Sequence, residues 1–131
     1  HVGWRGAIAG VIDATVNLMT GEGASISKII AAMGPCIAQK SYEVGAEYKD
    51  RFVAIDHANE RFFYGGKRTG QYHFDLSAFV RHRLECHGIF QISESDCDTC
   101  ADEDTFFSYR RSLSRGEDNY GRGISLIALA H

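Results

Sequence analysis

Residues 1–6 read His1-Val2-Gly3-Trp4-Arg5-Gly6 and run directly into an apolar stretch. The histidine precedes a Gly-Trp-Arg-Gly turn, and the arginine stands at the start of the helix predicted to follow. Junctions between a strand end and a helix N-terminus are where α/β proteins gather reactive side chains and bind anions. This stretch therefore predicts an α/β fold with a functional site close to the first residues.

The length of the chain sets the number of domains. At 131 residues, it is long enough to bury one hydrophobic core but too short for two. A natural protein seldom begins at a strand-to-helix junction. We therefore expect residues 1–131 to form a single domain that is the C-terminal part of a longer protein.

Charge and cysteine content exclude several classes of partner. The net charge is −3 and there is no basic stripe, which argues against nucleic acid and anionic membranes. The apolar runs Ser27–Cys36 and Gly123–Ala130 are shorter than the roughly 20 residues of a membrane span. Four cysteines are too few for a disulfide scaffold, so we expect a cytoplasmic protein.

The first half of the chain predicts two helices and a strand. Apolar residues recur with the helical period over Arg5–Thr20, and Gly21 can end that helix. Ser27–Met33 reads as a strand that Gly34-Pro35 stops. Ser41 can cap a second helix, with an apolar face made of Val44, Tyr48, Phe52 and Ile55.

The second half continues the alternation of strands and helices. Asp75 can cap a third helix that has His87 on its inward face and ends at Gly88. Further strands are predicted at Arg61–Tyr64, Gln71–Phe74, Phe90–Ser93 and Ile124–Leu129. The last is a continuous apolar run, which is typical of a strand buried on both faces. Gly65–Gly70 lacks the lysine-serine ending of a phosphate loop and is better explained as a turn.

His1 is the candidate metal ligand. A histidine alone specifies nothing, because most imidazoles have a structural role. At a rigid strand end, however, a neutral imidazole is a good zinc ligand, and catalytic zinc uses three such protein ligands and an open position. One ligand cannot make a site, so we expect His1 alone to hold zinc poorly.

The cysteines offer weaker candidates. Cys97 and Cys100 form a Cys-x-x-Cys pair, which is either a working disulfide or half of a structural zinc site that His82 and Cys86 of the third helix could complete. Helix geometry indicates that His82 and Cys86 do not converge well, so ordinary loop cysteines are favoured. Cys36 follows a strand end, where it is either a nucleophile or, more often, a small buried side chain.

The run Thr105–Arg111 combines aromatic rings with guanidinium groups. Arginine binds phosphate through two parallel hydrogen bonds, and aromatic rings stack on bases. The run therefore suits an anion beside a flat ring, but a core pair of phenylalanines with surface arginines explains it equally well. Arg5, Arg110 and Arg111 are the candidate contacts for substrate or phosphate.

Five segments together resemble one known family. In order they are His-Val-Gly-Trp-Arg-Gly from residue 1, Met-Gly-Pro-Cys-Ile from 33, Ser-Tyr-Glu-Val-Gly from 41, Thr-Phe-Phe-Ser-Tyr-Arg-Arg from 105 and Asn-Tyr-Gly-Arg from 119. They resemble the YfiH family, also called the laccase-domain or multicopper polyphenol oxidase family. The likeness covers essentially the whole chain, and the combination is far more specific than any one segment.

The resemblance implies an α/β sandwich with a mixed β-sheet and flanking helices, whose first strands lie outside this chain. It also implies a metal pocket of two histidines and one cysteine, from a Val-His-Gly segment, an Ala-Asp-Cys segment and the histidine ahead of Gly-Trp-Arg-Gly. Only the last has a counterpart here, His1. Family members often carry Cys-Thr where this chain has Asp98-Thr99, so a role for that cysteine does not transfer.

Three activities are associated with the family: copper-dependent polyphenol oxidation, purine nucleoside phosphorolysis with adenosine deamination, and editing of peptidoglycan precursors. The chain has six histidines and no His-x-His pair, which does not suit a multicopper centre. A single His/Cys/His site suits zinc, which has no redox activity. We therefore expect a zinc-dependent purine nucleoside phosphorylase that binds a purine nucleoside and phosphate; copper-dependent oxidation, precursor editing and non-catalytic ligand binding are the alternatives.

Overall fold

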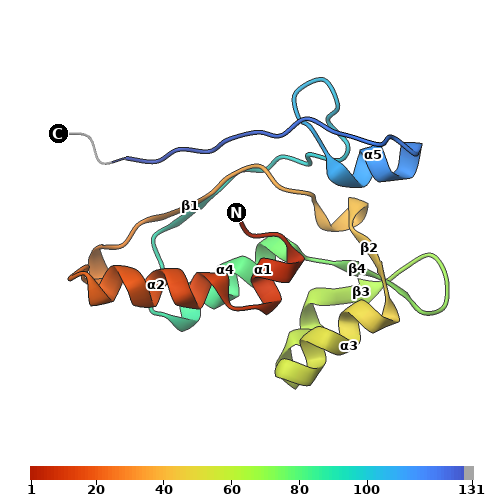
Figure 1. The fold of residues 1–131 in the computed structure, drawn as a ribbon. Helices are drawn as coiled ribbons and strands as arrows, with labels where there is room; N and C mark the ends of the chain where they lie inside the picture. The colour runs from red at the N-terminus through yellow and green to blue at the C-terminus, as the bar shows by residue number, and fades with distance from the viewer. Residues whose placement is uncertain (129–131) are drawn as a thin grey trace.

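The computed structural model describes residues 1–128, which form a mixed α/β structure (Figure 1). The α-helices are α1 (Trp4–Ile8), α2 (Val11–Gly21), α3 (Ala46–Ile55), α4 (Leu76–Cys86) and α5 (Tyr109–Arg115). Short 3-10 turns are η1 (Ile26–Lys28), η2 (Gln39–Ser41) and η3 (His57–Phe62). The strands are β1 (Ala31–Met33), β2 (Glu43–Gly45), β3 (Phe63–Gly65), β4 (Gln71–Phe74) and β5 (Ile92–Glu94). Over residues 1–128, no helix has the length and hydropathy that a bilayer crossing requires.

The strands form one parallel and one antiparallel sheet. β1 pairs with β5 in parallel, with Ala31 opposite Ile92. β4 lies between β2 and β3 and is antiparallel to both, with Tyr72 opposite Val44 and His73 opposite Tyr64. The mixed sheets and flanking helices confirm the predicted fold class.

The first predicted helix is two helices. Gly10 adopts a left-handed conformation, with φ of 76°, and separates α1 from α2. A residue with a Cβ is strained in that region. Glycine at position 10 therefore permits the change of chain direction between the two helices. The helical spacing of apolar residues continues from α1 into α2. The sequence pattern therefore predicts one helix where the structure has two.

The second predicted helix begins later than expected. Ser41 ends η2 and Val44 lies in β2, so α3 starts at Ala46 after Gly45. Val44 is therefore not on the helical face that Tyr48 and Phe52 share. The pairing of β2 with β4 supplies backbone hydrogen bonds from a distant part of the chain, which local helical spacing cannot predict.

The hairpin and α4 form as predicted, except that the strand expected at Arg61–Tyr64 is β3, Phe63–Gly65, because Arg61 and Phe62 belong to η3. β3 and β4 flank the glycine-rich turn, and Asp75 accepts a hydrogen bond of 2.9 Å from the Ala78 N–H at the start of α4. His87 is half-buried rather than fully in the core, because its Nε2 lies 2.8 Å from Asp13 Oδ1 of α2. Arg83 pairs with the same carboxylate, so polar contacts join α2 to α4.

Both predicted strands of the parallel sheet are shorter and shifted toward their C-terminal ends. The predicted Ser27–Met33 strand begins as η1 and becomes β1 only at Ala31. The predicted Phe90–Ser93 strand is β5, Ile92–Glu94. Extended backbone counts as a strand only where a neighbour hydrogen-bonds to it, and the register of the pair sets these limits.

Aromatic side chains fill the main core. Phe52 and Phe74 are 1% and 0% exposed, with ring centroids 4.8 Å apart. Phe63 stacks on Phe74 at 4.6 Å, and Phe79 meets Phe52 edge-on at 5.1 Å. Helix α3, helix α4 and the antiparallel sheet therefore share one core. A smaller apolar cluster of Ile12, Val16 and Ile89 lies between α2 and the end of α4.

The predicted C-terminal strand does not form over residues 124–128. This segment has no regular structure, and Ile124, Leu126 and Ile127 are 84%, 87% and 80% exposed. In Figure 1 it extends away from α5 toward the end of the described chain. An apolar run becomes a buried strand only when another strand pairs with it, and none of residues 1–123 does so. Leu129, which ends the predicted strand, lies outside the described residues.

Candidate functional site

Three of the sequence motifs meet in space around two tyrosines. Trp4 of the first motif lies against Tyr48 of α3, with ring centroids 4.9 Å apart. The hydroxyls of Tyr48 and Tyr42 are 2.8 Å apart, and Tyr42 belongs to the Ser-Tyr-Glu-Val-Gly motif. The guanidinium of Arg110, from the Thr105–Arg111 motif, lies 5.1 Å from the centre of the Tyr42 ring. A continuous line of side chains thus joins α1, α3, β2 and α5.

The two tyrosines are neutral hydrogen-bonding groups at physiological pH. Burial, the hydrogen bond to Tyr42 and the neighbouring phenol all raise the pKa of Tyr48 far above its ordinary value of 10.0. Burial also raises the pKa of Tyr42, against smaller opposing effects of Tyr48 and Arg110. Neither phenol is therefore a base. They position the surrounding aromatic and cationic groups.

His1 is exposed, and its imidazole folds back over Gly3. A Cβ added at Gly3 would lie 3.3 Å from His1 Nε2, so a residue without a side chain leaves room for the ring. Within residues 1–128, no group of three or more histidine, cysteine, aspartate or glutamate side chains could hold a metal ion. His1 can therefore offer a metal one ligand, and the other described residues do not complete a site with it.

Arg5 projects from α1 beside the indole of Trp4. Its guanidinium carbon lies 5.3 Å from the ring centre, and that of Arg51 on α3 lies 5.5 Å from the same centre. Both arginines are exposed. The sequence singled out Arg5 but not Arg51, because only the packing of α3 against the first motif brings them to one ring.

Arg110 and Arg111 do not converge on a common point. Arg110 donates a hydrogen bond of 2.6 Å from Nη1 to the Glu43 carbonyl, on the side of α5 that faces β2. Arg111 faces the loop before α5, where Nη1 donates to the carbonyls of Thr99 and Cys100 at 2.9 and 3.1 Å. Consecutive helical residues project about 100° apart, and this separates the two guanidinium groups.

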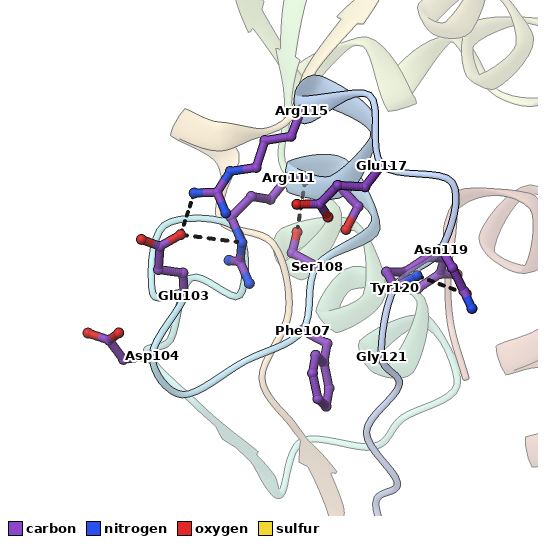
Figure 2. Close-up of a pocket in the computed structure, with 11 residues that line it drawn as sticks. Glu103, Asp104, Phe107, Ser108, Arg111, Arg115, Glu117, Asn119, Tyr120 and Gly121 are labelled. Carbon is purple, nitrogen blue, oxygen red and sulfur yellow. Dashed lines mark hydrogen bonds and ion pairs between the residues drawn. The ribbon is translucent and has the colours of Figure 1, made fainter.

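Arg111 also lies at the base of a surface cleft of about 430 Å³ (Figure 2). Its Nη2 donates to the Phe106 carbonyl, so the guanidinium is held by three backbone oxygens. Ser108 caps α5 by accepting a hydrogen bond of 3.3 Å from the Arg111 N–H. The loop and the first turn of α5 are therefore joined through this residue.

The rim of the cleft carries both signs of charge. Glu103 pairs with Arg115 and also lies 4.0 Å from Arg111 Nε, while Asp104 and Glu117 also line the cleft. Figure 2 shows Phe107 and Tyr120 near each other, away from the carboxylates of Glu103 and Asp104. Because carboxylates outnumber the guanidinium groups, this cleft is a poor site for a phosphate anion.

The cysteines have separate surroundings. Cys36 bridges to Asp98 in the backbone, and burial, despite an opposing hydrogen bond with Ser77, raises the pKa of its thiol, which disfavours a nucleophile. His82 and Cys86 do converge, contrary to the prediction: Nε2 and Sγ are 3.5 Å apart, since residues four apart share a helix face. They join no larger group of metal-ligand residues among those described.

Three residues of the site were not predicted as functional: Tyr42, Tyr48 and Arg51. Tyr42 stands inside a recognised motif, and that position is the signal that could have identified it. Tyr48 was assigned to the apolar face of a helix, which is correct but incomplete, because its hydroxyl bonds to Tyr42. Arg51 carries no local signal.

Comparisons with known proteins give one consistent family. The model of the family described as multi-copper polyphenol oxidoreductase laccase matches residues 1–130. A purine nucleoside phosphorylase of Rickettsia conorii is 39% identical over 129 residues, which are 98% of this chain and 53% of the relative. The purine nucleoside phosphorylase YfiH of Escherichia coli is 37% identical, over 88% of this chain and 46% of the relative.

Another relative and two solved structures agree with this assignment. An adenosine deaminase, RL5, from an unknown prokaryotic organism is 37% identical over 85% of this chain and 43% of the relative. The structure of YlmD from Geobacillus stearothermophilus has a TM-score of 0.77 at 31% identity, over 92% of this chain and 45% of that one. For YfiH of Bacillus licheniformis the TM-score is 0.79 at 28% identity, again over 92% and 45%. The chain spans about half the length of the curated relatives it matches.

Proposed function

Because the chain belongs to the laccase-domain family that includes YfiH, we propose that the protein is a purine nucleoside phosphorylase. The observation that carries the proposal is the 39% identity to a purine nucleoside phosphorylase across 98% of the chain. The family match over residues 1–130 includes the first motif, where His1 and Arg5 stand four residues apart. Arg5 also has the exposed guanidinium that an anionic co-substrate requires.

The proposed reaction exchanges one bond at the sugar. An oxygen of phosphate forms a bond to C1′ of the ribose, and the bond from C1′ to the purine nitrogen breaks. The electron pair of that bond goes to the purine, which gains a proton, and the products are ribose 1-phosphate and the free base. Guanidinium groups that bind the phosphate hold it in place for the attack.

We assign His1 one ligand position in a zinc site. The fit is incomplete, because residues 1–128 supply no group of three ligands, and so no step of the reaction is derived through the metal. Zinc binding at His1 would need two further protein ligands beyond the described set. Copper is the alternative metal, and metal analysis of the purified protein separates the two.

The test is an inosine assay with and without phosphate on the full-length protein. We expect hypoxanthine only when phosphate is present, and loss of this activity in His1→Ala. His1→Gln is a suitable second variant, because glutamine is polar but does not bind zinc as an imidazole does. Unchanged phosphorolysis in both variants would refute the role of His1. Nucleoside binding without product would favour a non-catalytic module.

Adenosine deamination is a second candidate activity, favoured by the similarity to the adenosine deaminase RL5. Water adds to C6 of the purine, the C6–N bond breaks, and ammonia leaves. Ammonia release from adenosine is independent of phosphate, so the same assay without phosphate distinguishes this reaction. Phenol oxidation predicts a copper requirement and oxygen consumption instead.

The state of the cysteines supports a cytoplasmic location. All four, Cys36, Cys86, Cys97 and Cys100, are free thiols. Free thiols persist in reducing compartments such as the cytoplasm.

A further inference from the structure

Two arginines from different helices share one tryptophan. Arg5 of α1 and Arg51 of α3 place their guanidinium carbons 5.3 and 5.5 Å from the centre of the Trp4 ring. The two groups are therefore no farther apart than the sum of these distances. Trp4 is itself fixed by contact with Tyr48, whose ring stacks on the buried Phe52 at 5.6 Å. The ring on which both guanidinium groups pack is therefore anchored to the buried core through Tyr48.

The N–H groups of both guanidiniums are free to bind a ligand. A guanidinium that packs against a ring uses its face, and its five N–H donors point outward in its plane. Among residues 1–128, neither Arg5 nor Arg51 makes an ion pair or a side-chain hydrogen bond, and both are exposed. Arg110 and Arg111, in contrast, donate to backbone carbonyls.

The carboxylate best placed to neutralise Arg51 is turned away from it. Glu47 is four residues before Arg51 on α3, the spacing at which helical ion pairs form. Its carboxylate instead folds back over Gly45, so closely that a Cβ at Gly45 would collide with it. The two cations therefore lack an acidic partner, and their mutual repulsion favours an anion that binds both.

We propose that Arg5 and Arg51 form a binding site for a phosphate oxyanion, with Arg51 as its second contact. Two planar forks of donors suit the tetrahedral oxygens of phosphate. The inference rests on the proposed function only in taking phosphate as the co-substrate. Phosphate can arrive as the free ion or as the ester of ribose 1-phosphate, which have the same oxyanion chemistry.

The fluorescence of Trp4 provides a direct binding test. Trp4 is the only tryptophan of this chain, and both arginines lie against it. We expect a saturable change in emission when inorganic phosphate is added at constant ionic strength, and none when chloride replaces it. The variant Trp4→Phe identifies the share of the signal that comes from this residue. Equal responses to phosphate and chloride would overturn the proposal.

Substitution of Arg51 isolates the second contact. Arg51→Gln should weaken phosphate binding by about tenfold or more, because one charged hydrogen-bonding partner is lost. Arg51→Lys should restore part of the affinity, since it keeps the charge without the fork. The control is Arg68→Gln, which removes an exposed arginine of the hairpin turn that stacks on no aromatic ring within residues 1–128. An equal loss in Arg68→Gln would show a general charge effect and overturn the site.

The two proposals fail in different ways. If Arg51→Gln weakens phosphate binding while inosine is never cleaved, the anion site stands and the phosphorylase assignment falls. If inosine is cleaved and Arg51→Gln leaves the KM for phosphate unchanged, the assignment stands and the site falls. Parallel titration with ribose 1-phosphate shows which form of the oxyanion binds: tighter binding than inorganic phosphate indicates that the sugar is also recognised.

Discussion

Arg110 and Arg111 differ from Arg5 and Arg51 in what their guanidinium groups contact. Arg110 and Arg111 donate to carbonyl oxygens of Glu43, Thr99, Cys100 and Phe106, and so tie α5 to β2 and to the preceding loop. Arg5 and Arg51 lie over the Trp4 ring and, among residues 1–128, their side chains make no hydrogen bond or ion pair. An arginine whose N–H groups are occupied by backbone carbonyls stabilises the fold. One that is held by an aromatic face can still bind an anion.

The sharpest test of this contrast is the stability of single-site variants. Arg111→Ala should lower the free energy of unfolding by about 3 kcal/mol, because three half-buried carbonyls lose a charged donor. Arg51→Ala should lower it by no more than about 1 kcal/mol, since only contact with an aromatic face is lost. Urea denaturation followed by circular dichroism measures both. Equal losses would contradict the distinction between the two pairs.

The contacts of Arg110 give the next largest effect. Arg110→Gln should reduce stability by about 1.5 kcal/mol, through loss of the bond to the Glu43 carbonyl and of the contact with Tyr42. Tyr42→Phe, which keeps the ring and removes the hydroxyl bond to Tyr48, should cost about 1 kcal/mol. A double-mutant cycle between Arg110→Gln and Tyr42→Leu, which removes the ring, measures the coupling of the two side chains, and additive losses would show that Arg110 acts only through Glu43.

A smaller, pH-dependent effect is expected at Arg83, which binds a carboxylate rather than a carbonyl. Burial alone would raise the pKa of Asp13, but hydrogen bonds from Arg83 and His87 lower it below its ordinary value of 3.8. A lowered pKa means that Asp13 stabilises the fold above that value and that this contribution is lost as pH falls through the folded-state pKa. Asp13→Asn should therefore lower the free energy of unfolding by about 1 kcal/mol at pH 7. The effect is this small because both side chains of the pair are partly exposed to solvent.

The measurement is denaturation of both proteins at several pH values. The difference between the natural protein and Asp13→Asn should shrink as the pH is lowered below about 4, where the carboxylate is protonated. Asp13→Glu is the control. It keeps a carboxylate at this position, so its stability should retain the pH dependence that Asp13→Asn loses. A difference that is constant over the whole range would show that packing, not charge, links α2 and α4.

Local signals in the sequence predicted those parts of the fold that local forces determine. Asp75 is followed by an apolar helical period, and it caps α4 as expected. Ser41 precedes a similar period but does not cap a helix, because Val44 pairs with Tyr72 from a distant strand. The apolar run at 124–128 reads as a buried strand, yet burial requires a partner that the run itself does not specify.

The site was predictable only in part for the same reason. The first motif made Arg5 a candidate contact from its position at a turn, without knowledge of the rest of the fold. Arg51 and Tyr48 acquire their positions beside Trp4 through the packing of α3, which no pattern within a single segment encodes. The divergence of Arg110 and Arg111, however, follows from helical geometry alone and could have been anticipated.

The paired phenols of Tyr42 and Tyr48 define an alkaline limit for the protein. Burial is the main cause that holds the pKa of each above the ordinary value of 10.0, so the folded chain resists their ionisation. The unfolded chain ionises them freely, and stability must fall as the pH rises beyond that value. The chain has six tyrosines, so the difference in tyrosinate absorbance between the natural protein and Tyr42→Phe isolates the signal of this pair, and base titration then becomes an optical assay of the line of contacts from Trp4 to Arg110.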